Sequence, residues 1–229
     1  MTTTTPLVSI SVLSWNSKEL TRACINSILE NVQGVPFELI IIDNASTDGS
    51  REMLTAEFFE EHDSRIRLFF NTENKKFAGG NNQALEHARG KYFLLLNSDA
   101  IVHPGSIEAM VQFLETSPHY GAVTTKLLNN DGSVQYYMHR RFPTALRLAA
   151  AIVHKRFLWF CPRVVKQYCY LDKNFEEDFD VEQAAGACLM VRRDILPQIR
   201  GLFDEKHFAL YYNDVDLCTR LWQNGLKIR

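Results

Sequence analysis

Two aspartates of this sequence stand where a carboxylate could do chemistry. Asp99 ends the triplet Asn97-Ser98-Asp99 directly after the apolar run 92–96, and Asp214 opens a helical pattern further along the chain. A short apolar run bounded by polar residues is typical of a strand buried on both faces. On an extended segment the oxygens of Asn97 and Asp99 point the same way, so both can face one hard cation. The alternative is an ordinary polar turn that ends a strand.

Asp214 suits a different role. A carboxylate at the start of a helix beside a crevice can accept a proton from an attacking hydroxyl, which makes Asp214 a candidate general base. The alternative role is a helix N-cap that interacts favourably with the helix dipole. We interpret Asp216, in the same first turn, as a dipole partner or as a group that supports Asp214.

The chain that leads to Asp99 alternates strands and helices. Strands are predicted over 7–13, 37–42, 66–70 and 91–96, and helices over 17–30, 51–60 and up to about 88. This alternation predicts an α/β fold with a doubly wound, mainly parallel sheet. The carboxyl ends of parallel strands share one edge, where ligands bind in open α/β sheets. Each joint at that edge carries a polar side chain, so we expect one polar crevice lined by Asn16, Asp43, Asn74 and Asp99.

Beyond Asp99 the pattern predicts a helix over 106–115, strands over 121–128 and 181–191, and a hairpin-type turn over 129–132 that leads into 133–137. The segment 143–170 is apolar and basic, and we expect it to be largely helical. Between Gly132 and Leu171 there is no acidic residue, whereas aromatic residues and seven basic ones are interleaved: Arg140, Arg141, Phe142, Arg147, Lys155, Arg156, Phe157, Trp159, Phe160, Arg163 and Lys166.

This composition allows two interpretations of the basic segment. Basic residues with Trp, Phe and Leu suit a segment that lies in a membrane interface, so the protein could contact the inner membrane face peripherally. The alternative is an amphipathic helical excursion that packs on the sheet or on a second subunit of a homodimer, with its basic residues facing the acidic segment 172–182.

Composition excludes several classes of protein. A length of 229 residues with 46% hydrophobic residues suits one large domain, and a net charge of −2 argues against nucleic-acid binding. Five scattered cysteines without a CxxC pair favour reduced thiols in a cytoplasmic protein over a zinc site or a disulfide framework. Residues 1–6 lack the basic region of a signal peptide, and no apolar run reaches the ~18 residues of a membrane span. Dinucleotide, phosphate-loop and nucleophile-elbow motifs are absent from the sequence, which leaves hydride transfer and kinase chemistry little support.

Six ordered motifs resemble those of glycosyltransferase family 2, and most closely its rhamnosyltransferase-like branch. They are Val8-Ser-Ile-Ser-Val-Leu-Ser-Trp-Asn16, Asp43-Asn-Ala-Ser-Thr-Asp-Gly-Ser50, Phe77-Ala-Gly-Gly-Asn-Asn82, Leu95-Leu-Asn-Ser-Asp99, Gly186-Ala-Cys-Leu-Met-Val-Arg192 and Tyr212-Asn-Asp-Val-Asp-Leu217. The resemblance implies a GT-A fold over residues 1–229. It divides the chain into a nucleotide-sugar-binding half (1–128) and an acceptor and catalytic half (129–229), the latter with an antiparallel portion of sheet.

The resemblance also implies a function. The expected reaction is an inverting transfer of a sugar, with rhamnose as the leading candidate, from a dTDP- or UDP-linked donor to a hydroxyl of a saccharide or lipid-linked acceptor in cell-surface polysaccharide synthesis. Asn97-Ser98-Asp99 matches the family's metal motif with Asn in place of its first acid, so Asp99 and Asn97 would hold Mg²⁺ or Mn²⁺. Asp214 matches the catalytic base, and Asp43 matches the residue that contacts the base or ribose of the nucleotide. The other donor-binding candidates are Ser14, Trp15, Asn16, Asn44, Asn74, Phe77, Asn81, Asn97 and Ser98.

One further candidate comes from its position alone, and two departures concern the family pattern. Arg89, at the end of the helix before the 91–96 strand, could reach the donor; its alternative role is a cation that stabilises the helix C-terminus. Lys76 stands where the family usually has glycine, and the family's metal-binding histidine is expected on a segment beyond Arg229. Two other functions stay open: a non-catalytic nucleotide-sugar-binding domain, which needs no base, and a nucleotidyltransferase, which would release pyrophosphate from a triphosphate.

Overall fold

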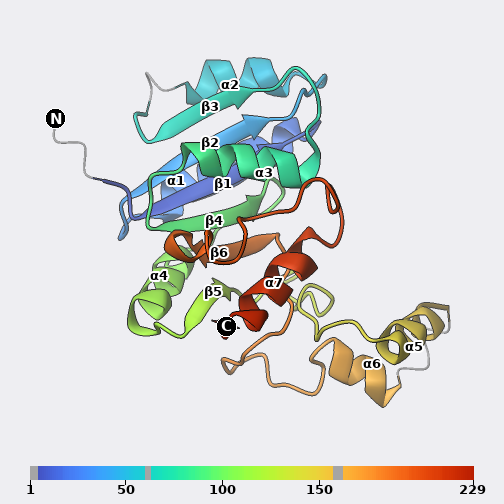
Figure 1. The fold of residues 1–229 in the computed structure, drawn as a ribbon. Helices are drawn as coiled ribbons and strands as arrows, with labels where there is room; N and C mark the ends of the chain where they lie inside the picture. The colour runs from blue at the N-terminus through green and yellow to red at the C-terminus, as the bar shows by residue number, and fades with distance from the viewer. Residues whose placement is uncertain (1–4, 60–62, 157–161) are drawn as a thin grey trace.

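A seven-stranded sheet forms the centre of the computed structural model, which describes residues 5–59, 63–156 and 162–229 (Figure 1). Its strand order is β3-β2-β1-β4-β6-β5-β7. The strands are β1 (Val8–Ser14), β2 (Phe37–Asp43), β3 (Ile66–Phe70), β4 (Tyr92–Asn97), β5 (Tyr120–Thr124), β6 (Cys188–Arg192) and β7 (Lys227–Ile228). The helices are α1 (Lys18–Asn31), α2 (Ser50–Phe58), α3 (Lys76–His87), α4 (Ser106–Thr116), α5 (Ala145–Arg156), α6 (Arg163–Tyr168) and α7 (Asn213–Gln223), with a single 3₁₀ turn η1 (Arg193–Ile195).

The first four strands are parallel, and the reversal comes in the second half of the chain. Val8 at the start of β1 lies opposite Phe37 of β2 and Tyr92 of β4, and β3 continues the parallel ladder beside β2. Strand β6 runs antiparallel between β4 and β5, whereas β7 is parallel to β5. The predicted fold class, a mainly parallel α/β sheet with an antiparallel portion, is confirmed.

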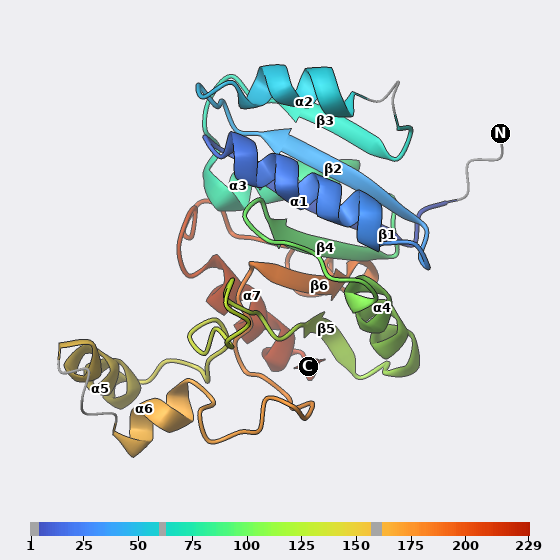
Figure 2. The ribbon, with the colours of Figure 1, turned by 180° about the vertical axis from the view of Figure 1, so that it is seen from behind.

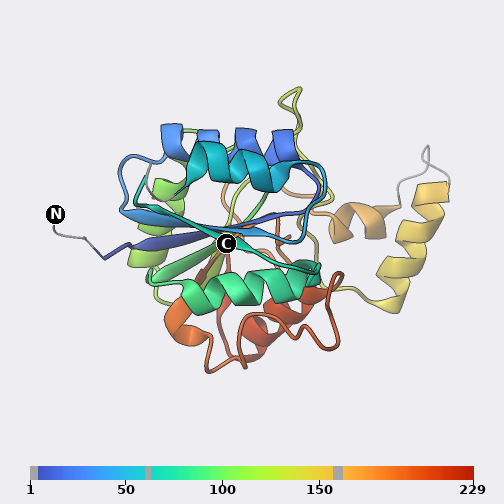
Figure 3. The ribbon, with the colours of Figure 1, turned by 90° about the horizontal axis from the view of Figure 1, so that it is seen from above.

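Alternate side chains of the buried strands pack into two separate hydrophobic cores, one on each face of the sheet. Ile10 and Leu94 point to the face covered by α1, α2 and α4, whereas Ile40 and Phe93 point to the face covered by α3 and α7. Figure 2 shows α1 and α4 on the first face, and the view along the sheet in Figure 3 separates the two helical layers. Continuous apolar strands are required because both faces are covered.

Two predicted strands are longer in the sequence pattern than in the structure. Strand β5 ends at Thr124, whose hydroxyl donates to the carbonyl of Cys188, and residues 125–128 are not part of it. Strand β6 begins only at Cys188, so the small residues Ala184–Ala187 form a loop instead of its first half. The predicted turn at 129–132 is present, but residues 133–137 contribute only a bridge between Leu128 and Val134.

The basic segment forms an arm, here defined as residues 143–170, that carries α5 and α6. The arm projects from the body in all three views (Figures 1–3). No described residue of α5 belongs to either core of the sheet, so the predicted packing on the sheet is not observed. Two basic residues at its root do face the acidic segment, since Arg141 pairs with Asp172 and Arg147 lies 3.7 Å from Glu182. Phe157, Trp159 and Phe160 lie outside the described residues.

None of the helices in the described part of the chain combines the length and the apolar character needed to cross a membrane.

Candidate active site

The polar residues that follow the parallel strands lie along one edge of the sheet, as the sequence predicts. Ser14 at the end of β1 lies opposite Asp43, and Leu13 lies opposite Asn97. The loops after these strands are joined to one another. The Asn16 amide donates to Ser46 Oγ at 2.9 Å, and Ser17 Oγ lies 3.2 Å from Ser98 Oγ. Hydrogen bonds between short side chains therefore fix this edge.

The end of β2 carries a buried polar cluster. Asn44 donates from Nδ2 to Asn74 Oδ1 at 2.8 Å, and its Oδ1 accepts from the Lys75 amide at 3.0 Å. Asp43 is 1% exposed, and its Oδ2 accepts from the Ser46 amide. Its Oδ1 is buried and has no hydrogen-bond partner among the described residues. Because an unpaired buried acceptor is costly, this oxygen is suited to a donor group from a ligand.

Strained backbone conformations gather at the same edge. Asn16, Ala45, Lys76 and Tyr212 have φ angles of 51°, 63°, 62° and 63°, in the left-handed region. Such conformations in residues other than glycine cluster at functional sites. Lys76, which replaces the glycine of the family pattern, thus keeps the backbone conformation that glycine favours.

Other predicted donor residues lie at this edge with mixed roles. The Ser14 side chain is buried, with its Oγ 2.9 Å from Thr21 Oγ1, whereas Trp15 is 56% exposed. Phe77, at the start of α3, packs against Phe203, with 5.7 Å between the ring centroids. The exposed Trp15 indole therefore adds apolar surface at this edge of the sheet.

Asn97 and Asp99 both line a cavity of about 660 Å³. Asp99 is exposed, and the Asn97 amide donates to the Ala187 carbonyl at 2.9 Å. Within the described ranges no group of three His, Cys, Asp or Glu side chains could hold a metal ion. One carboxylate and one amide oxygen still suit Mg²⁺ or a similar hard cation, which keeps several waters and takes its other oxygens from substrate phosphates.

Asp214 lies beside the Ala184–Ala187 loop, next to Gly186. A Cβ atom placed on Gly186 would lie 4.0 Å from Asp214 Cβ and 3.3 Å from Phe77 Cζ, so the glycine lets Asp214 and the Phe77 ring lie close together. Helix α7 begins at Asn213 after Tyr212, and Asp214 Oδ1 accepts from the Val215 amide at 2.8 Å. Asp214 is therefore not the N-cap, although it lies in the first turn.

Burial raises the pKa of Asp214 above its ordinary value. The Val215 amide, the charge of Arg140 and the Gly186 amide act in the opposite direction, but burial has the largest effect. A carboxylate with a raised pKa is a stronger proton acceptor, and a pKa perturbed by burial beside a charged partner is typical of functional sites. The environment of Asp214 thus suits general-base chemistry.

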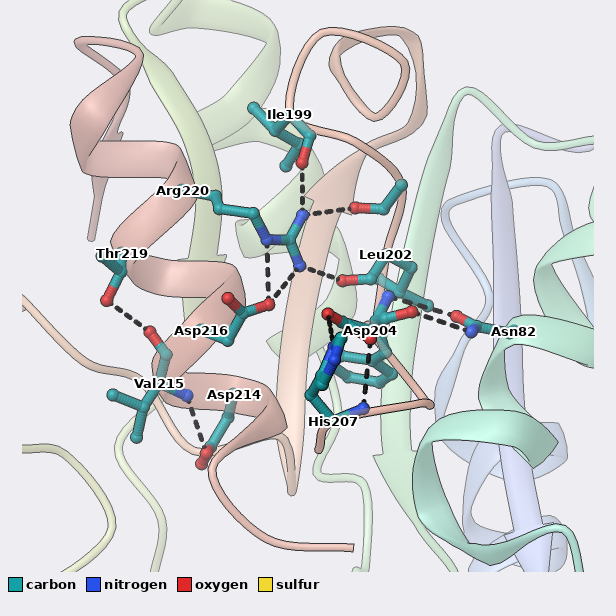
Figure 4. Close-up of polar contacts among 12 residues, drawn as sticks. Asn82, Ile199, Leu202, Asp204, His207, Asp214, Val215, Asp216, Thr219 and Arg220 are labelled. Carbon is teal, nitrogen blue, oxygen red and sulfur yellow. Dashed lines mark hydrogen bonds and ion pairs between the residues drawn. The ribbon is translucent and has the colours of Figure 1, made fainter. Parts of the chain in front are cut away.

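A network of hydrogen bonds holds the start of α7 in place (Figure 4). Asp216 pairs with Arg220 at 2.9 Å, and the Arg220 guanidinium donates to the carbonyls of Ile199, Gly201 and Leu202. Asn82 of α3 donates to the Phe203 carbonyl in the same loop at 3.0 Å. Asp216 therefore supports Asp214 through the Arg220 contact to the 199–202 loop.

Two predicted donor residues do not face the crevice. Asn81 is buried against the sheet, where its Oδ1 accepts from Ser11 Oγ at 2.9 Å and its Nδ2 donates to the Phe77 carbonyl. Arg89 precedes β4, so it lies at the amino edge of the sheet, about 20 Å from the carboxyl edge at ~3.3 Å per residue. There its guanidinium pairs with the buried Glu38 at 2.8 Å. The prediction that Arg89 reaches the donor is wrong, because its position before the strand places it at the opposite edge.

The structure adds one residue that the sequence did not single out for this site. Arg140 forms a backbone bridge with Gln183, and its charge acts on Asp214. Its Nε is buried without a hydrogen-bond partner among the described residues. In the sequence Arg140 is one of seven basic residues in a segment without acids, so its local sequence does not indicate that it lies near Asp214.

Comparison with known proteins identifies the family of the chain. The pattern of the family "Glycosyl transferase family 2" matches residues 9–200. The chain is 28% identical over 232 residues to the uncharacterized protein y4gI of Sinorhizobium fredii, which covers 96% of this chain and 23% of that protein. It is 28% identical over 202 residues to the N-acetylglucosaminyl-diphospho-decaprenol L-rhamnosyltransferase of Mycobacterium tuberculosis, which covers 83% of this chain and 62% of that enzyme.

A solved structure shows the same architecture. The mannosyltransferase PcManGT of Pyrobaculum calidifontis, in complex with GDP-Man and Mn²⁺, superposes with a TM-score of 0.64 at 19% sequence identity. The superposition covers 99% of this chain and 55% of that one, so the chain spans only part of the length of the proteins it matches. With the family pattern matched from residue 9 to residue 200, and with a GT-A fold, the chain belongs to glycosyl transferase family 2.

Proposed function

We propose that this chain is an inverting glycosyltransferase that moves a sugar from a nucleotide-diphosphate donor to a hydroxyl of a saccharide or lipid-linked acceptor in cell-surface polysaccharide synthesis. The observation that carries the proposal is the half-buried Asp214, whose pKa is raised and which meets the donor side of the crevice at Gly186. A nucleotide-binding domain without catalysis would have no need for a carboxylate in this state.

The donor nucleotide is proposed to bind over the ends of β1 and β2. The unpaired Oδ1 of Asp43 would accept a hydrogen bond from the base or the ribose, which would remove the penalty of an orphaned buried acceptor. Ser14, Trp15, Asn16, Asn44, Asn74 and Phe77 would line or support the same pocket, and Asn97 and Ser98 would lie under the diphosphate. We leave Arg89 out of this set, and Asn81 acts by holding α3 on the sheet.

A divalent cation, Mg²⁺ or Mn²⁺, would be held by Asp99 with Asn97. When bound, it would supply Lewis-acid stabilisation of the charge on the leaving diphosphate. Support comes from the two oxygens that line one cavity and from the Mn²⁺ in the PcManGT complex.

The chemistry assigned to the protein itself is a proton transfer at Asp214. Its carboxylate accepts the proton of the acceptor hydroxyl while the hydroxyl oxygen bonds to the anomeric carbon. The bond from that carbon to the diphosphate oxygen breaks, and its electron pair leaves with the nucleoside diphosphate. Attack opposite the leaving group would invert the anomeric configuration, with Asp214 as the general base.

The donor is proposed to carry rhamnose, as dTDP-rhamnose, with UDP-sugars as the next candidates. The support is the rhamnosyltransferase of M. tuberculosis among the relatives. We place the reaction in the cytoplasm, in agreement with the buried thiols of Cys24, Cys188 and Cys218, none of which forms a disulfide.

Product analysis with a panel of nucleotide sugars tests the proposal. The protein is incubated with dTDP-rhamnose, UDP-sugars or GDP-mannose, with a lipid-linked or saccharide acceptor, and with or without Mn²⁺. We expect a glycosylated acceptor of inverted configuration and release of a nucleoside diphosphate. Release of pyrophosphate from a nucleoside triphosphate would instead indicate a nucleotidyltransferase. Donor binding without turnover across the panel, unaffected by Asp214→Asn, would indicate a binding domain.

A further inference from the structure

The cavity of about 660 Å³ beside Asp99 lies on the face of the sheet that α1 and α4 cover (Figure 2). Its floor is formed by buried apolar side chains of the core on that face: Leu94, Leu96, Val102, Ile107 and Met110. Two more lining residues are apolar and exposed, Ile101 at 54% and Leu128 at 39%. The cavity is therefore apolar from its mouth to its floor, as small-molecule sites typically are at this size.

One wall of the cavity is a hairpin whose polar groups bond to one another. Residues 127–135 form this hairpin, and most of them line the cavity. Asn129 Nδ2 donates to Ser133 Oγ at 2.8 Å, and Gln135 Nε2 donates to the Leu128 carbonyl at 2.9 Å. Because these polar groups find their partners inside the hairpin, this wall requires no polar ligand.

Charged side chains stand at the rim of the cavity. The acidic and basic residues among its described lining are Asp99, His103 and Lys126, and all three are exposed. Lys126 pairs with Glu176 at 2.8 Å. Burying a charge without a partner is costly, so a charged group would not enter the apolar interior. The chemistry of the walls thus selects an uncharged, apolar occupant.

The cavity meets Asp214 at the carboxyl edge of the sheet through two segments. Ala187 lines the cavity, and it follows Gly186, where a Cβ atom would lie 4.0 Å from Asp214 Cβ. Met138 lines it too, and Arg140, whose charge acts on Asp214, is two residues further on. Two residues of chain span at most about 7 Å. A single ligand can therefore place one end at Asp214 and the other in the cavity.

We propose that the cavity binds an aliphatic chain of the acceptor, which makes the acceptor a lipid-linked sugar whose reacting hydroxyl lies close to the lipid. The sugar lies at the carboxyl edge between Asp99 and Asp214, and the chain gains affinity by leaving water for the apolar walls. This inference rests on the proposed function, because it takes the ligand that reaches both Asp214 and the cavity to be the acceptor.

Calorimetry with methyl, hexyl and octyl glucoside, below their micelle-forming concentrations, tests the cavity without turnover. We expect affinity to rise with chain length, by up to about fourfold for each buried methylene. Ile101→Gln/Leu128→Gln should lower the affinity for octyl glucoside roughly tenfold. Met138→Trp, which fills the cavity, should remove the gain from chain length. Octanoate should bind more weakly than octyl glucoside, because its carboxylate would lie beside Asp99.

Leu20→Gln/Leu171→Gln is the matched control, since these leucines are 54% and 37% exposed outside the cavity. It should bind octyl glucoside like the unaltered protein, and equal melting temperatures would show that the variants are folded. Equal affinity of the unaltered protein for methyl and octyl glucoside would overturn the proposal, as would equal loss in the cavity and control variants.

Two further outcomes would assign the cavity to another ligand and also overturn the proposal. Displacement of octyl glucoside by UDP or dTDP would assign it to the donor, and tighter binding of octanoate would assign it to a free fatty acid. The proposed reaction fails separately. Chain binding without any sugar transfer would refute the reaction alone, whereas sugar transfer without chain-dependent binding would refute the chain site alone.

Discussion

The two sides of the crevice are positioned by different means. On the donor side, parallel strands in register bring Ser14, Asp43 and Asn97 to one edge, and hydrogen bonds between short side chains tie the loops together. On the acceptor side, Asp214 stands at the start of a helix, held by the Arg220 contacts to the 199–202 loop. The proposed donor side fixes geometry through the sheet, whereas the proposed acceptor side raises the pKa of one half-buried carboxylate.

This difference predicts a separation of effects. Changes at the strand ends should alter donor binding more than turnover, because they affect the bound ground state. Changes around Asp214 should alter turnover more than donor binding, because an interaction made only in the transition state affects kcat. Mutations on the two sides of the crevice can therefore test whether these effects are separate.

The largest expected effect is that of Asp214→Asn on turnover. Loss of a general base should lower kcat by roughly two to four orders of magnitude, while calorimetry should find donor affinity unchanged. The folded-state pKa of Asp214 is raised, so its ionisation lowers stability as pH rises from the unfolded value through the folded one. The Asn variant should therefore melt no lower than the unaltered protein at neutral pH. Near-normal kcat in Asp214→Asn would remove the base assignment.

Asp99→Asn should act on donor binding instead. The side chain is exposed at a strand end outside both cores, so the melting temperature should stay unchanged. Calorimetry of a nucleoside diphosphate with and without Mn²⁺ should show that the metal-dependent gain in affinity is lost, with a tenfold loss equal to about 1.4 kcal/mol. Asp178→Asn, which removes an exposed carboxylate of the acidic segment 172–182, is the control and should keep that gain. A metal-dependent gain that persists in Asp99→Asn would place the cation elsewhere.

The pH profile should respond to Arg140. Since Asp214 must be deprotonated to act, kcat/KM should fall as pH drops through its raised pKa, above the ordinary aspartate value of 3.8. Arg140 lowers that pKa, so Arg140→Met should move the acid limb to higher pH. Arg141→Met, which removes the pair with Asp172, should leave the limb in place. Equal limbs in all three proteins would show that Arg140 does not act on the base.

The sequence predicts the donor side better than the acceptor side, for a physical reason. Buried parallel strands are continuous apolar runs, and their register brings the residues after them together, so Asp43 and Asp99 could be placed from local pattern. The neighbours of Asp214 include Gly186 and Arg140, which reach it only through long-range packing. The Arg89 prediction is wrong although its sequence position indicates the reason: a residue between a helix and the following parallel strand lies at the amino edge, opposite the edge where ligands bind.

The smallest expected effect concerns backbone strain on the donor side at Lys76. A φ of 62° costs a residue other than glycine about 1–2 kcal/mol of folded-state free energy, which Lys76→Gly would relieve. Glycine also gives the unfolded chain more conformational freedom, which offsets roughly 0.4–1 kcal/mol of that gain. Lys76→Gly should thus raise Tm by about 1–3 °C. Lys76→Ala removes the same charge and keeps the strain, so it should show no such rise.

The neighbouring lysine supplies a second control for the same argument. Lys75 has an ordinary φ of −73°, so Lys75→Gly relieves no strain and should only lower Tm. If Lys76→Gly melts no higher than Lys76→Ala, the strain is not stored at this position. A rise in Lys76→Gly alone, with donor affinity kept, would show that the donor edge holds its geometry through the sheet and its hydrogen bonds, and tolerates the lysine at a small energetic cost.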